Sequence, residues 1–119
     1  MDGILVVAHG SRRKETEETF HRVVDRVRRD LELPVETAFM EFSERSIRWG
    51  LESLAARGLK DILVLPYFLF EGMHIRKDIP EEIGEFSKEH PGVQVTLGDV
   101  LGDDPRLSGL LLDRIRQAR

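Results

Sequence analysis

Apolar residues along this chain follow two alternating patterns. Short apolar runs at residues 4–8, 35–40, 62–66 and 93–97 predict four buried strands. Between and after these runs, apolar residues recur every three or four positions, which predicts amphipathic helices. The helical positions are Phe20, Val23, Val24, Val27 and Leu31, then Ile47, Leu51, Leu54 and Ala55, then Ile79, Ile83 and Phe86, and last Leu107, Leu110, Leu111 and Ile115.

The alternation of strand and helix predicts the fold class. Pro34, Gly58 and the Pro91-Gly92 pair separate the segments where helices should end. Strands that are apolar throughout and separated by helices form parallel sheets covered on both faces. We therefore expect a single doubly wound α/β domain over residues 1–119, with a four-stranded parallel sheet flanked by helices.

Composition narrows the classes of protein. The chain has 119 residues, 40% of them hydrophobic, which suits one compact domain without a deep enclosed cavity. The net charge of −4 argues against nucleic acid or a membrane surface as partner, and the absence of cysteine excludes thiolate metal sites. The first residues are too charged for a signal peptide, and no apolar run approaches the ~20 residues of a membrane span. We expect a cytoplasmic protein.

The candidate chemistry lies where the predicted strands end. In open parallel sheets, ligands bind beyond the carboxyl ends of the strands. The first strand is followed by His9-Gly10-Ser11, the second by Glu41, and the third by a predicted loop that contains His74. Each histidine alone could be an ordinary hydrogen-bonded residue. Together with a carboxylate, however, two imidazoles suit a first-row divalent metal.

The other two histidines are less informative. His21 borders the apolar positions of the first helix, and we expect it at the boundary of the core. His90 precedes Pro91-Gly92, and we expect it to be exposed in a turn.

Positive charges stand where the first and third helices should begin. The helix dipole disfavours cations at that end, so their repeated presence at one edge indicates a function. Free N–H groups of helix N-termini already attract anions, and arginines strengthen that attraction. The candidate cations, with Arg45 from the start of the second helix, are Arg12, Arg13, Lys14, Arg45, Arg76 and Lys77.

Aromatic and apolar residues also follow the third strand. Phe68, Phe70 and Met73 could be core residues, but in a loop at the edge of the sheet they could form an apolar wall. Known phosphate motifs are missing, and Ala8 stands where histidine phosphatases have an arginine before His9.

These motifs together resemble a known family. "HGSR" after the first strand, Glu41 after the second, "PYFLFEGMHIRKDIP" after the third and "GDDP" near the last helix resemble the class II tetrapyrrole chelatases. The likeness is to the short CbiX type of sirohydrochlorin cobaltochelatase and ferrochelatase, and it spans the whole chain. It implies a chelatase-like, flavodoxin-like architecture. It also implies that His9, His74 and Glu41 form the catalytic site and that the two histidines receive the metal.

The resemblance also implies a substrate and a partner. Sirohydrochlorin carries eight carboxylates around a flat apolar macrocycle, which matches a cationic edge with an apolar wall. Longer relatives contain two such domains, which implies that this chain forms a homodimer. The substrate would be Co²⁺, Fe²⁺ or Ni²⁺ together with sirohydrochlorin, with no organic cofactor, in cobalamin or sirohaem biosynthesis. The expected substrate-binding residues are Ser11, Arg12, Arg13, Arg45, Phe68, Phe70, Gly72, Met73 and Arg76.

Two other functions stay open at this point. A non-catalytic carrier of tetrapyrrole or metal would use the same edge without accelerating metal insertion. A phosphatase with His9 as nucleophile would use the same histidine, although Ala8 argues against it.

Overall fold

The computed structural model describes residues 1–118, apart from the side chain of His74. Strands and helices alternate along the chain, as the hydrophobic pattern predicts, which confirms the α/β fold class. The elements are β1 (Gly3–Ala8), α1 (Lys14–Asp30), β2 (Val35–Phe39), α2 (Ile47–Ala56), β3 (Asp61–Pro66), α3 (Met73–Glu89), β4 (Gln94–Leu97) and α4 (Pro105–Gln117).

The four strands form one parallel sheet in the order β2-β1-β3-β4. Ala8 at the end of β1 pairs with Phe39, and Val7 pairs with Pro66 at the end of β3. The residues that follow β1, β2 and β3 therefore leave the sheet at the same level. We call this end of the sheet the carboxyl edge.

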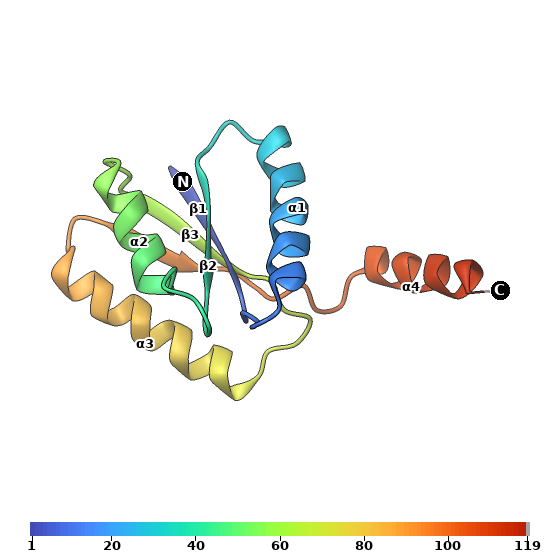
Figure 1. Cartoon of the computed structure of the whole chain (residues 1–119). Coiled ribbons are helices and arrows are strands. Elements are labelled where there is room, and N and C mark those ends of the chain that lie inside the picture. The colour runs from blue at the N-terminus through green and yellow to red at the C-terminus, as the bar shows by residue number, and fades with distance from the viewer. Residues whose placement is uncertain (119) are drawn as a thin grey trace.

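Helices cover the sheet on two faces (Figure 1). α2 and α3 lie on one face, where Leu51, Ile79 and Phe86 pack on Val7 and Val64 in the larger apolar core. α1 lies on the other face and packs against the β2 side of the sheet. On that face Phe20 and Val24 form a second core, whose other members are Ile4, Ala8, Val35 and Phe39.

α3 begins earlier than the sequence pattern indicates. It starts at Met73, so His74 belongs to its first turn and not to a loop as expected. Pro80 lies inside this helix, where it has no N–H to donate to the preceding turn. A proline is most favourable in the first turn of a helix, so the sequence favours a later start.

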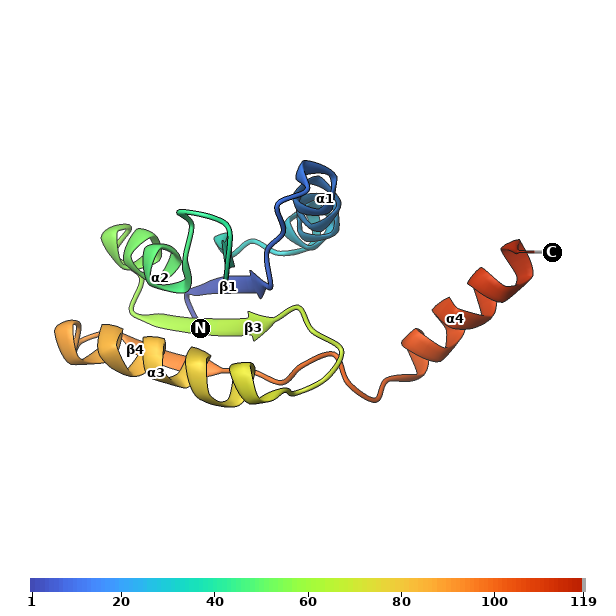
Figure 2. The same cartoon turned by 60° about the horizontal axis from the view of Figure 1, so that its bottom comes forward.

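α4 departs from the expected two-sided arrangement. The sequence pattern predicts a helix that packs on the sheet of its own chain, but α4 buries none of its residues. Figures 1 and 2 show it extending away from the sheet. The Cα radius of gyration is 15.3 Å, with a longest dimension of 54 Å. A compact chain of this length has a radius of about 13.5 Å.

The opposite end of the sheet carries short turns. His90 caps α3 at its C-terminus, and the turn through Pro91 and Gly92 leads into β4. A side chain added at Gly92 would meet no atom within 4 Å.

Among the described residues, no helix is long and apolar enough to cross a membrane.

Candidate functional site

His9 and Glu41 lie side by side beyond the ends of β1 and β2. The pairing of these strands continues past their last residues, because the Met40 amide donates to the Ala8 carbonyl and the Glu41 amide donates to the His9 carbonyl (both 3.0 Å). This places His9 Nε2 3.8 Å from Glu41 Oε2, with both side chains about half exposed. The sequence prediction that these two residues meet is confirmed.

Gly10 allows this close approach. Its φ is +100°, a conformation that side chains other than glycine rarely adopt. A Cβ atom at this position would overlap the backbone carbonyl of Glu41. The glycine after His9 therefore fixes the distance between the two candidate residues.

His74 stands in the first turn of α3, but its side chain lies outside the described residues. Its predicted role with His9 stays a prediction.

Two cavities of different chemistry border His9. The first, here called the acidic cavity, has a volume of about 320 Å³ and lies on the α3 side. Its lining residues are His9, Met40, Glu41, Asp78, Glu81 and Glu82. The second, the α1-side cavity, has a volume of about 400 Å³. Its lining residues are Ala8, His9, Gly10, Thr16, Thr19, Phe20, Tyr67 and Phe68.

Glu82 is half-buried in the acidic cavity. Burial raises its pKa above the ordinary value of 4.5, and the nearby charges of Glu85 and Asp78 raise it further. Sequence reasoning missed this group of carboxylates, because Asp78, Glu81 and Glu82 resemble the solvated face of an ordinary helix. Their three- and four-residue spacing is the signal that places them on one side of α3.

The candidate cations are spread along the carboxyl edge rather than gathered at one point. The Arg12 guanidinium lies 4.9 Å from the centre of the Phe42 ring, and that of Arg45 lies 5.2 Å from Trp49. Arg13 precedes α1 directly and lies 3.6 Å from Glu15. Stacking on a ring leaves the guanidinium edges of Arg12 and Arg45 able to donate to an anion.

The other expected substrate-binding residues differ in their surroundings. The Ser11 hydroxyl accepts a hydrogen bond from the Arg13 amide (3.0 Å). Gly72 caps α3, and Arg76 lies 3.5 Å from Glu71. Arg13 and Arg76 thus each stand beside a carboxylate of their own chain, which partly offsets their charge.

The predicted apolar wall is partly formed. Phe68 meets His9 edge to face, with ring centres 6.4 Å apart, and packs against the core. The side chains of Phe70 and Met73 are 80% and 77% exposed. Of these three residues, Phe68 is the one whose contact with His9 the structure describes.

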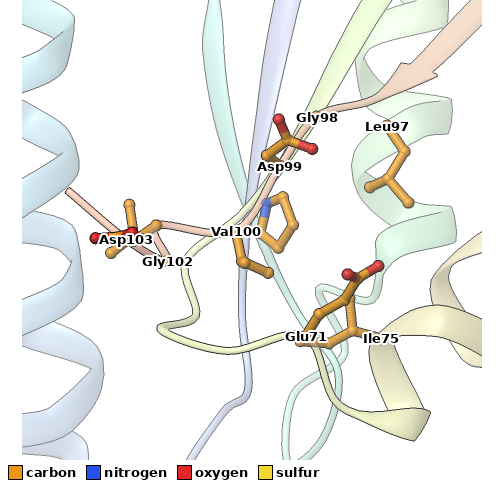
Figure 3. Close-up of a pocket in the computed structure, with 10 residues that line it drawn as sticks. Glu71, Ile75, Leu97, Gly98, Asp99, Val100, Gly102 and Asp103 are labelled. Carbon is orange, nitrogen blue, oxygen red and sulfur yellow. The ribbon is translucent and has the colours of Figure 1, made fainter.

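A third cavity, of about 390 Å³, opens between the loops after β3 and β4. Figure 3 shows Glu71 and Asp99 reaching it from these two loops, with Asp103 farther along the second. Among the side chains that the structure describes, no histidine lines it. Carboxylates therefore line the β4 side of the carboxyl edge as well as the acidic cavity, and the arginines Arg12, Arg13 and Arg45 lie at the β1 and β2 side.

His90 is not the exposed turn residue that the sequence predicts. Its Nε2 lies 2.8 Å from Glu52 Oε1, and its ring stacks on Phe86 with centres 4.4 Å apart. Glu52, Glu89 and His90 are close enough together to hold a metal ion, but Arg48 pairs with both carboxylates. This group is an ion-pair network between α2 and α3, away from the carboxyl edge.

The fold and the site together define a parallel α/β protein with imidazole and carboxylate chemistry at the carboxyl edge of its sheet. The family model named CbiX matches residues 3–118, so the chain belongs to the CbiX family. The resemblance identified from the sequence motifs is thereby confirmed.

Curated relatives of two lengths match the chain. A sirohydrochlorin cobaltochelatase from Methanothermobacter thermautotrophicus is 34% identical, and the match covers 98% of this chain and 92% of that protein. A sirohydrochlorin ferrochelatase from Priestia megaterium is also 34% identical, but the match covers 98% of this chain and only 44% of that protein. The chain thus spans less than half of this longer relative and nearly all of the shorter one.

The solved structures that match the chain also have two lengths, one similar to this chain and one about twice as long. A cobalamin (vitamin B12) biosynthesis CbiX protein from Marinobacter aquaeolei superposes with a TM-score of 0.84 at 30% identity, covering 99% of this chain and 97% of that one. The sirohydrochlorin chelatase SirB from Bacillus subtilis subspecies spizizenii, solved in complex with cobalt, superposes with a TM-score of 0.91 at 28% identity. That superposition covers 98% of this chain and 51% of SirB.

Proposed function

We propose that this chain is a chelatase that inserts a divalent metal ion into sirohydrochlorin. The observation that carries the proposal is the pair formed by His9 and Glu41, whose side chains lie 3.8 Å apart at the carboxyl edge, between two cavities. Relatives named as sirohydrochlorin chelatases support it. Residues 1–119 act as one chelatase-like unit in this proposal.

The reaction replaces two protons of the macrocycle by one divalent ion, so the total charge is unchanged. A divalent ion enters the macrocycle, and two pyrrole N–H protons leave. In our proposal the neutral imidazole of His9 binds the ion through its lone pair, with His74 as the second ligand. Once the ion has passed to the macrocycle, the two imidazoles of His9 and His74 are free to accept the two released protons, and the Glu41 carboxylate stabilises the imidazolium of His9.

The edge residues hold the tetrapyrrole in this proposal. Arg12 and Arg45 donate to peripheral carboxylates while stacked on Phe42 and Trp49, and Phe68 contacts the macrocycle next to His9. Ser11 accepts a bond from Arg13, but its O–H remains able to donate to a carboxylate. The further candidates for binding sirohydrochlorin are Arg13, Phe70, Gly72, Met73 and Arg76.

Co²⁺ is the metal we propose first, with Fe²⁺ and Ni²⁺ as substrates of the same chemistry, because all three accept imidazole and carboxylate ligands. The proposal needs no organic cofactor, and the product would serve cobalamin or sirohaem biosynthesis. The cytoplasm remains the expected compartment.

A homodimer completes the proposed site. α4 exposes Leu111 and Ile115, and Leu63 and Leu65 of β3 are only partly buried on the α1 face, where α1 packs mainly against β2. We propose that each α4 covers this part of the sheet of a second copy. SirB supports this proposal, because this chain covers only 51% of it. A second copy of this chain could take the place of the other half.

An anaerobic assay tests the function. Purified protein is mixed with sirohydrochlorin and with Co²⁺, Fe²⁺ or Ni²⁺ in turn, and metal insertion is followed by absorbance. The proposal expects insertion well above the spontaneous rate with at least one metal. Tight binding of sirohydrochlorin with only the spontaneous rate would identify a carrier, and hydrolysis of an aryl phosphate would identify a phosphatase.

A further inference from the structure

The turn that follows β2 contains a residue in an unfavourable backbone conformation. Phe42 has a φ of +59°, and within residues 1–118 every other residue with a positive φ is a glycine. In this left-handed region the Cβ atom comes close to the following carbonyl oxygen, so glycine and asparagine adopt it far more readily than a large side chain does. The chain thus has an aromatic residue where a smaller one would fit the backbone better.

Neither the turn nor the core explains this phenylalanine. The turn is closed by the Phe39 amide, which donates to the Arg45 carbonyl (2.8 Å), and by the Ser43 hydroxyl, which accepts from the Arg45 amide (3.0 Å). Phe42 is 54% exposed and belongs to neither apolar core. Strained backbone conformations cluster at functional sites, where a particular side chain is needed. The contacts of the ring therefore explain its presence better than packing does.

The ring of Phe42 contacts the guanidinium of Arg12, whose Cζ atom lies 4.9 Å from the ring centre. Arg12 follows His9 in the loop after β1. Phe42 comes directly after Glu41, so the contact joins the two loops that carry the candidate pair. A guanidinium over an aromatic ring is attracted by its π face and keeps its N–H edges able to donate to an anion.

The charge of Arg12 is available to a ligand. Arg13, the next residue, lies 3.6 Å from Glu15. Within the part of the chain that the structure describes, Arg12 forms no ion pair with a carboxylate. A long side chain loses rotamer freedom when it binds a ligand, and a contact that orders the guanidinium beforehand reduces that loss.

We propose that Phe42 is a positioning residue, which holds the Arg12 guanidinium in place to bind a peripheral carboxylate of sirohydrochlorin next to His9. This inference rests on the proposed chelatase function, and it assigns the backbone strain at Phe42 to the binding of the tetrapyrrole. The peripheral carboxylates keep their charge while the metal enters, so the contact is equally strong before and during insertion. Phe42 should therefore affect the KM for sirohydrochlorin and leave kcat unchanged.

Three variants separate the ring from the backbone strain. Phe42→Asn removes both, Phe42→Leu removes the ring and keeps a large side chain at the positive φ, and Phe42→Tyr keeps the ring. Initial rates of Co²⁺ insertion give kcat and separate KM values for sirohydrochlorin and for Co²⁺. We expect the KM for sirohydrochlorin to rise about fivefold in Phe42→Asn and Phe42→Leu, the size of one cation–π contact. Phe42→Tyr should keep this KM within about twofold of wild type, and all three variants should keep kcat and the KM for Co²⁺ within about twofold.

The melting temperature is a second readout. Because asparagine adopts a positive φ more readily than phenylalanine, Phe42→Asn should melt at or above the wild-type temperature while its KM for sirohydrochlorin rises. A purely structural role of the ring predicts the reverse, a lower melting temperature with an unchanged KM.

A double-mutant cycle tests whether the ring acts through the guanidinium. Arg12→Gln should raise the KM for sirohydrochlorin at least about tenfold, as expected for the loss of a hydrogen bond between charged groups. Adding Phe42→Leu to Arg12→Gln should raise this KM no further, because the ring then has no guanidinium to position.

Four results would overturn the inference: a wild-type KM for sirohydrochlorin in Phe42→Leu, an equal rise in Phe42→Tyr, a lower melting temperature of Phe42→Asn, or the same effect of Phe42→Leu with and without Arg12→Gln. If the wild-type protein inserts no metal, the proposed function fails. Equilibrium titration of sirohydrochlorin into the metal-free protein then decides the inference by itself. Phe42→Leu should bind sirohydrochlorin about fivefold more weakly than wild type, and equal binding, or no binding to either protein, would contradict the assigned role.

Discussion

At the scale of single residues, His9 combines an exposed side chain with a backbone held firmly by β2. The Glu41 amide donates a hydrogen bond to its carbonyl, whereas its imidazole is half-exposed and belongs to neither apolar core. Removing the ring should therefore affect chemistry and leave the fold unchanged.

We expect His9→Ala to lower the rate of metal insertion at least about a hundredfold, the usual effect of losing a ligand or proton acceptor. The thermal melt should match that of wild type. His74→Ala is expected to give a similar loss of rate. His21→Ala is the control, because His21 packs beside Phe20 and Phe39 and lies outside the proposed site. A His9 variant that inserts cobalt at the wild-type rate would remove His9 from the mechanism.

Gly10→Ala should impair both stability and activity. The new methyl group would overlap the Glu41 carbonyl, and the positive φ disfavours any side chain. We expect a loss of about 1–3 kcal/mol in the free energy of unfolding, from overpacking and backbone strain. Insertion should also slow, because Glu41 moves away from His9. Gly72→Ala is the comparison, since a Cβ there meets nothing within 4 Å. Equal stability of the two variants in urea would contradict this account.

At the scale of elements, the network of Arg48, Glu52, Glu89 and His90 joins α2 to α3. The pKa of Glu52 lies below its ordinary value of 4.5, mainly because Arg48 donates a hydrogen bond to it, with a smaller contribution from His90. A carboxylate whose pKa is lowered by folding stabilises the protein above that ordinary value, and this stabilisation is lost as the pH falls through the lowered pKa.

Glu52→Gln should therefore lower the melting temperature at pH 7 by about 2–4 °C, the size expected for a partly exposed ion pair with a hydrogen bond. The difference between variant and wild type should shrink as the pH falls below 4.5 and disappear below the lowered pKa of Glu52, where the carboxyl group is protonated in both states. Melts at several pH values check this. A difference that stays constant as the pH falls below 4.5 would mean that the side chain acts through packing instead of charge.

Elements whose apolar residues face their own core could be predicted from the sequence, and the others only in part. β1, β2 and β3 lie within a residue or two of the predicted runs, because each strand buries apolar residues on at least one face within the chain. The start of α3 was misplaced because Pro80 favours a helix that begins near it. The partners of His90 were missed because Glu52 is 38 residues away along the chain, and short-range patterns carry no signal of such contacts.

The candidate site shows the same division. His9 and Glu41 were predictable, because parallel strands bring their carboxyl ends together whatever the loops do. The acidic cavity was not, since it forms only when α3 packs beside the ends of β1 and β2. The position of α4 was also not predictable, because an amphipathic pattern does not say which copy of the chain the apolar side contacts.

At the scale of the whole molecule, α4 decides the expected assembly. We expect light scattering to give about twice the chain mass of 13.7 kDa. Leu111→Glu places a charge on the exposed apolar side of α4 and should shift the protein towards monomer, with a loss of specific activity. Arg116→Ala makes the same one-unit change in charge on the opposite side of the helix and should remain dimeric. A wild-type protein that is monomeric at micromolar concentration and fully active would show that one carboxyl edge is sufficient.

The turn at Gly92 is a suitable position for a probe that follows this assembly. The sequence contains no cysteine, and a side chain at Gly92 would contact nothing, at the end of the sheet opposite the candidate site. Gly92→Cys therefore creates a single thiol for a spin label or a fluorophore. In a symmetric pair of chains, the two labels report one distance. A change in that distance distribution on dilution would report separation of the subunits, and a change on addition of tetrapyrrole would report their rearrangement. Neither measurement alters the residues of the candidate site.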